Sequence, residues 1–328
     1  MSAAKGPLSL FEIPRPIVEP IVAALRLGNT AFDELFYDVG VLATQLWLRG
    51  SLVDADSDAT QTANSGTTDG FHEIGLSALS NPEGSILIVD TARPPYVVHR
   101  FDDVGKFIRA SKTMSPPIRN ISITGVGSSA LGSVAFAWNI SSALGEPVAA
   151  IVPGYGVADV VAQALGGWFG FGFQSWLKQS AQRMLAATSP ETARIGRALM
   201  LTAPGHQEEN GAPVFARGSG SSDVLHAILE EGSGIHRLFG HSKGALVIEN
   251  AVADLPKPTL EPLEIVTFGC PIVEQPPAKY RQILGWFDAL GLLNSWGNAP
   301  DMLIPAQHTT NSWLPLSVPV TWLTDVET

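Results

Sequence analysis

A short apolar strand that runs straight into a Gly-x-Ser-x-Gly turn is the strongest constraint in this sequence. Residues 235–244 read Ile-His-Arg-Leu-Phe-Gly-His-Ser-Lys-Gly, and the apolar, helix-compatible residues 245–252 follow at once. The backbone of such a strand-to-helix turn is crowded and strained, so the residues flanking its tip must have almost no side chain. Gly240 and Gly244 meet this requirement on either side of Ser242. The pattern predicts a sharp elbow with Ser242 at its tip. The alternative is a glycine-rich loop whose serine only caps a helix.

Short apolar runs alternate with helix-compatible segments over most of the chain. Besides the strand before the elbow, we predict strands over 85–89, 121–124, 148–152, 263–268 and 292–296, and helices over 128–144 and 277–290. Continuous apolar runs of this length are typical of strands that are buried on both faces. Strands that alternate with helices predict an α/β fold with a doubly wound, mostly parallel sheet.

The chain divides into three predicted regions. Residues 1–50 carry apolar stripes at helical spacing and are predicted to be a helical segment packed on the core, with an oligomer contact or a lipid interface as the alternative. Residues 51–82 are predicted to be a mobile polar loop and lead-in, because 54–70 are rich in Asp, Ser, Thr, Asn and Gly. Residues 83–328 form the predicted α/β domain, with a helical insertion, a cap or lid, at about 157–221.

Charge, cysteine content and apolar tracts exclude several classes of protein. A formal net charge of −11 argues against a nucleic-acid partner, because phosphate binding needs a basic surface. The single cysteine, Cys270, cannot form an internal disulfide. The apolar tract 148–173 is broken by polar residues and glycines, so we expect no integral membrane span. The N-terminus has no apolar signal region, so we expect a cytoplasmic protein, with leaderless export as the alternative.

The serine at the elbow needs a base and an orienting acid to become a nucleophile. His308 is the one histidine downstream of Ser242, in a C-terminal loop after the last predicted strand. Asp301 lies in a proline-flanked turn shortly before it and is the favoured acid. Asp288, predicted in mid-helix, and Glu274 are the weaker candidates. The remaining histidines lack metal-ligand spacing, so no metal is expected. Gly125, Gly127 and Gly132 do not have the spacing of a dinucleotide-binding loop, so no cofactor is expected either.

His241 adjoins Ser242, and we expect its side chain to point away from the tip of the elbow and to pack beside the turn. A developing oxyanion also needs backbone donors. One is expected at Lys243, directly after the serine, and the other at Val126 or Gly127, in a glycine-rich loop between a strand and a helix. The competitor for the second donor is the Gly-Tyr-Gly turn at 154–156.

Large aromatic side chains interleave with glycines between residues 166 and 176. Flexible backbone with bulky apolar side chains suits a lid over an apolar substrate pocket. The alternative is close packing of core helices at the glycines. The residues predicted to form this pocket or lid are Trp168, Phe169, Phe171 and Trp176.

Three stretches resemble the α/β-hydrolase superfamily, and within it the lipases and esterases. Residues 240–244, Gly-His-Ser-Lys-Gly, match the Gly-His-Ser-x-Gly form of lipases. Residues 267–273, Thr-Phe-Gly-Cys-Pro-Ile-Val, are similar to a stretch of class 3 (fungal-type) lipases, and 301–313 resemble their acid and base regions. The resemblance implies Ser242 as nucleophile, Asp301 as acid and His308 as base.

The expected activity is that of a serine hydrolase. It would cleave carboxylic esters through an acyl-enzyme, and its substrate would be a small apolar ester. Two alternatives stay open: an acyltransferase or polyester depolymerase with the same triad, and a non-catalytic binding or scaffold protein with the hydrolase fold.

Overall fold

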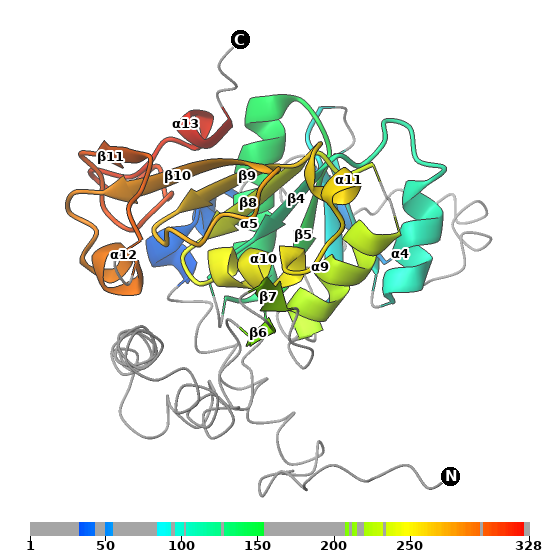
Figure 1. Cartoon of the computed structure of the whole chain (residues 1–328). Helices are drawn as coiled ribbons and strands as arrows, with labels where there is room; N and C mark the ends of the chain where they lie inside the picture. The colour runs from blue at the N-terminus through cyan, green and yellow to red at the C-terminus, as the bar shows by residue number, and fades with distance from the viewer. Residues whose placement is uncertain are drawn as a thin grey trace, which may run out of the picture.

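A nine-stranded sheet forms the centre of the molecule (Figure 1). The computed structural model describes residues 33–42, 50–54, 84–92, 96–101, 103–125, 128–153, 207–209, 212–214, 220–231, 234–295 and 298–324. The strands follow the order β1 (Gly50–Asp54), β3 (Tyr96–Phe101), β2 (Ile86–Asp90), β5 (Val148–Ile151), β4 (Asn120–Ile123), β8 (Arg237–His241), β9 (Glu264–Phe268), β10 (Lys279–Gly285) and β11 (Met302–Ile304). Strand β2 is antiparallel to both neighbours, and every other neighbouring pair is parallel.

Helices cover both faces of the sheet (Figure 1). On one face lie α5 (Ala130–Leu144) and α13 (Val320–Thr324), and on the other lie α4 (Val104–Ser111), α9 (Gly220–Glu230) and α10 (Gly244–Val252). Successive strand residues point to opposite faces. Leu87 and Val89 therefore belong to the apolar core under α5 and α13, and Ile86 and Ile88 belong to the core under α4, α9 and α10. This arrangement confirms the predicted doubly wound α/β fold.

The structure also contains three smaller elements. They are α11 (Lys257–Leu260), α12 (Ala289–Asn294) and the separate hairpin of β6 (Gln207–Glu209) and β7 (Ala212–Val214). Among the described residues, no helix is both long and apolar enough to span a bilayer.

The sequence-based assignment was wrong between residues 277 and 296. The predicted helix over 277–290 is largely strand β10, and the described part of the predicted strand over 292–296 belongs to α12 and its C-cap. The apolar residues in β10 gave no clear helical or strand period, and pairing with β9 decided their structure. Ile283 and Leu284 are buried on opposite faces of that pair. Asp288 therefore lies not in mid-helix but at the N-cap of α12, just beyond β10.

The N-terminal part of the chain is described over residues 33–42 and 50–54. The first of these segments packs on the same face as α5, with Tyr37 and Leu42 in the core. The second is β1, an edge strand that pairs with β3 inside the region expected to begin a polar loop. The rest of that expected loop and most of the predicted cap at 157–221 lie outside the described residues.

Candidate active site

The elbow between β8 and α10 has the geometry that the Gly-x-Ser-x-Gly pattern predicts. Ser242 has a φ of 54°, in the left-handed region that disfavours a side chain. A Cβ on Gly240 would lie 2.8 Å from the Ala245 Cα, and one on Gly244 would lie 2.4 Å from the backbone oxygen of Ile123. Both glycines are therefore required by close backbone packing. The tight turn holds Ser242 at the carboxyl end of a central strand.

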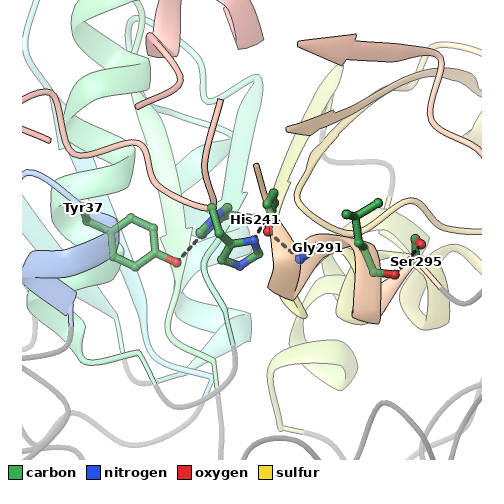
Figure 2. Close-up of polar contacts among 7 residues, drawn as sticks. Tyr37, His241, Gly291 and Ser295 are labelled. Atoms are coloured by element: carbon green, nitrogen blue, oxygen red, sulfur yellow. Dashed lines mark hydrogen bonds and ion pairs between the residues drawn. The ribbon is translucent and has the colours of Figure 1, made fainter. Parts of the chain in front are cut away.

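His308 and Asp288 form a buried pair after two strands that lie further along the sheet, beyond β9. Asp288 follows β10 and His308 follows β11, and the histidine Nδ1 lies 2.7 Å from the aspartate Oδ2. The Asp288 side chain is 0% exposed. Its other oxygen accepts the backbone N–H of Gly291 in α12 (Figure 2). Because both carboxylate oxygens are bonded, Asp288 fixes the imidazole and leaves Nε2 for another partner.

The elbow and the His308 loop meet at the end of β9. The Ser242 N–H donates to the Phe268 carbonyl at 2.7 Å. The His308 ring packs on the Phe268 ring with centroids 6.2 Å apart. The next residue, Gly269, has a φ of 72°, and a Cβ there would lie 2.6 Å from His308 Cε1. Among the described residues, no hydrogen bond joins the Ser242 hydroxyl to His308. Such bonds are often long in a free enzyme and shorten when substrate binds.

Asp301, the acid favoured from sequence, lies elsewhere. Its carboxylate accepts the backbone N–H of Gln282 at 2.7 Å, and the side chain is exposed at the start of β11. Glu274 contacts the Gln282 amide at 3.3 Å. The structure thus brings Asp288 to His308, and neither of the other two acids. A capping signal was present in the sequence, because Asp288 directly precedes the apolar residues 289–293.

The loop after β4 lies against Ser242. A Cβ on Gly125 would be 3.7 Å from the Ser242 Oγ. The predicted donors Val126 and Gly127 follow directly but lie outside the described residues, as do the predicted lid residues Trp168, Phe169, Phe171 and Trp176. Lys243, the other predicted donor, is the N-cap of α10, where backbone N–H groups point out of the helix.

His241 packs beside the turn, as expected from the sequence. Its Nδ1 lies 2.7 Å from the Tyr37 hydroxyl (Figure 2). Its ring stacks on Phe268, and its centroid is 4.8 Å from that of His308. Burial, together with the neighbouring His308, holds the pKa of His241 well below its usual range. His241 is therefore neutral and does not compete with His308 for a positive charge.

Asp33 is a buried carboxylate that the sequence analysis did not identify. It accepts the Ser128 hydroxyl at 2.7 Å and the Ser129 N–H at 2.8 Å, at the start of α5. Burial raises its pKa to about 6, and the hydrogen bonds from the two serines oppose that rise. Asp33 thus ties the N-terminal segment to the end of the loop that contacts Ser242.

We expect the Asp33→Asn variant to have a flatter dependence of stability on pH. The folded protein binds the Asp33 proton more tightly than the unfolded chain, so the stabilisation is complete below about pH 4 and is lost as the pH rises through about 6. Between these two pH values the contribution of Asp33 to the free energy of unfolding of the wild type falls by about 3 kcal/mol. Urea unfolding from pH 4 to 8 should show the variant gaining stability relative to the wild type as the pH rises. If the free energies of unfolding of the two proteins change in parallel with pH, the pKa of Asp33 is not raised in the folded protein.

Within the described ranges, no group of three or more His, Cys, Asp or Glu side chains is arranged to hold a metal ion. No protein-family model, curated protein or solved structure matches this chain. The proposal for its function therefore depends on the geometry of the site.

Proposed function

We propose that this chain is a serine hydrolase of the α/β-hydrolase type that cleaves carboxylic esters, with Ser242, His308 and Asp288 as its triad. The observation that carries the proposal is the buried His308–Asp288 pair beside a strained serine elbow. The three residues follow β8, β10 and β11, so all lie beyond the carboxyl ends of parallel strands. Their order in the chain, Ser, Asp, His, is the order of α/β-hydrolases.

The geometry suggests a two-step acyl transfer. The Ser242 Oγ attacks the ester carbonyl while His308 Nε2 takes the hydroxyl proton, and Asp288 holds Nδ1–H and stabilises the imidazolium. The Lys243 N–H, together with a donor from the loop after Gly125, stabilises the oxyanion. The C–O bond then breaks, the alcohol leaves with the proton from His308, and an acyl-enzyme remains. Water, deprotonated by His308, releases the acid and restores Ser242.

Exposed apolar side chains beside Asp288 support an apolar ester as substrate. Trp286 and Phe287, between β10 and Asp288, are 62% and 59% exposed. Leu292 on α12 is also exposed. Large side chains that face water this close to the acid give an acyl or alcohol group apolar surface to contact.

Labelling with a fluorophosphonate probe tests this proposal directly. The probe needs an activated serine, so we expect wild type to be labelled at Ser242, with no labelling of Ser242→Ala. In His308→Ala, which lacks the base, labelling should slow by about 100-fold or more. Mass spectrometry of peptides locates the label.

Ser222→Ala is the control for this labelling. Ser222 is a buried serine on α9 that bonds to Asn250, so its loss removes a hydroxyl away from the elbow and should leave labelling unchanged. A folded wild type without label would favour the non-catalytic scaffold instead.

A further inference from the structure

We propose that the helical turn at residues 33–37 is a positioning element of the site, in which the Tyr37 hydroxyl holds both the loop after β4 and the His241 ring at the elbow. The inference rests on the proposed function, because it concerns the alignment of the same triad. The Tyr37 N–H bonds to the Asp33 carbonyl at 2.7 Å, so the two side chains lie one turn apart.

The Tyr37 hydroxyl joins two parts of the site. It accepts the Gly125 N–H at 3.0 Å and lies 2.7 Å from His241 Nδ1. The Tyr37 oxygen accepts the Gly125 N–H, and as part of this proposal we assign its single hydrogen to Nδ1 of the neutral His241 ring. The ring hydrogen of His241 is then on Nε2. In the described part of the chain Nε2 has no hydrogen-bond partner, so Tyr37 is the polar contact that sets the orientation of this ring.

The same turn also holds the loop that carries His308. The Leu35 carbonyl accepts the Thr309 hydroxyl at 2.7 Å, and the Phe36 carbonyl accepts the Thr310 N–H at 2.9 Å. The Phe36 ring meets the His308 ring edge to face, with centroids 5.7 Å apart. The turn therefore contacts residues immediately after the histidine base.

Three segments that are far apart in sequence thus share one anchor. Asp33 and Tyr37 hold the loop after β4, Tyr37 holds His241 beside Ser242, and the backbone of the turn holds the loop after β11. Catalytic groups must be aligned to within a fraction of an ångström, and a misplacement of about 1 Å can lower the rate by about 100-fold. Tyr37 is buried, so it acts through these loops. It is a positioning residue.

The test compares Tyr37→Phe with the control Tyr280→Phe. Tyr280 is a largely buried tyrosine on β10 whose hydroxyl also accepts a backbone N–H, from Gln275 at 2.9 Å, but it does not contact the triad. We expect Tyr37→Phe to lower kcat for ester hydrolysis by about 10- to 100-fold with KM within about twofold. The control should lose stability without a loss of kcat. Equal kcat values in the two variants would overturn the proposal.

A second readout does not depend on turnover. Long-range ¹⁵N–¹H NMR spectra of the histidine rings report which nitrogen carries the proton. We expect wild-type His241 to be a single neutral tautomer protonated on Nε2, and Tyr37→Phe to show a mixture. A wild-type ring protonated on Nδ1 would overturn the proposal even if Tyr37→Phe fails to fold. Because the spectrum is independent of catalysis, it also separates this inference from the proposed function, which fails if wild type takes no fluorophosphonate label.

Discussion

Replacing Asp288 by asparagine is expected to lower kcat for ester hydrolysis by about 10⁴-fold, the loss known for the equivalent change in a serine protease. The carboxylate accepts Nδ1–H of His308 and so leaves Nε2 unprotonated, ready to take the serine proton. An asparagine amide oriented by the Gly291 N–H would present its NH₂ group to Nδ1. The ring would then carry its hydrogen on Nε2 and could not act as the base.

Asp301→Asn is the matched control for this prediction. It also neutralises a carboxylate that accepts a backbone N–H, from Gln282, but it lies on the exposed start of β11. We expect its kcat to stay within about threefold of wild type, since a surface substitution away from the site changes little. Initial rates with chromogenic esters, on variants shown to be folded by circular dichroism, measure both effects. A large loss in Asp301→Asn with activity retained in Asp288→Asn would reverse the assignment.

The elbow could be predicted because its signal is local. A buried strand, two glycines around a serine and an apolar helix follow one another in the sequence, and the close contacts of Gly240 and Gly244 explain why no other residue fits. His308 could be chosen as the candidate base because it is the one histidine after Ser242. In both cases the relevant residues are adjacent in sequence or have no competitor.

The carboxylate that contacts His308 could not be chosen from sequence because its position depends on pairing between distant residues. The position of Asp288 follows from where β10 ends, and β10 forms because it pairs in parallel with β9. With residues 277–290 interpreted as a helix, Asp288 had no reason to face His308. Asp301 was nearer in sequence to the histidine, and nearness in sequence does not determine which side chains meet across a sheet edge.

The polar contacts of the N-terminal segment were equally invisible in the sequence. Its apolar spacing predicted packing on the core, and Tyr37 and Leu42 do pack there. The Tyr37 hydroxyl bonds to a histidine 204 residues away, and Asp33 to a serine 95 residues away. A tyrosine and an aspartate one helical turn apart are compatible with any partly exposed helix, so only the fold reveals their partners.

The elbow also predicts that stability and activity can be separated at one position. Ser242→Gly and Ser242→Ala both remove the proposed nucleophile, so neither should hydrolyse esters above about 10⁻⁴ of the wild-type rate. They should differ in stability. A left-handed backbone costs a residue with a Cβ about 1–2 kcal/mol, and glycine avoids this cost. The greater conformational freedom of glycine in the unfolded chain offsets part of the resulting stabilisation. We therefore expect Ser242→Gly to be more stable than Ser242→Ala by about 1 kcal/mol.

Urea unfolding of both variants measures this difference, and Asp254 offers a matched comparison. Asp254 has a φ of 56°, in the same backbone region, and is exposed. The free-energy difference between Asp254→Gly and Asp254→Ala should be of similar size, since it reports the backbone alone. If Ser242→Gly is no more stable than Ser242→Ala while the Asp254 pair shows the difference, the elbow stores no strain. The left-handed backbone at Ser242 would then be relieved by its surroundings.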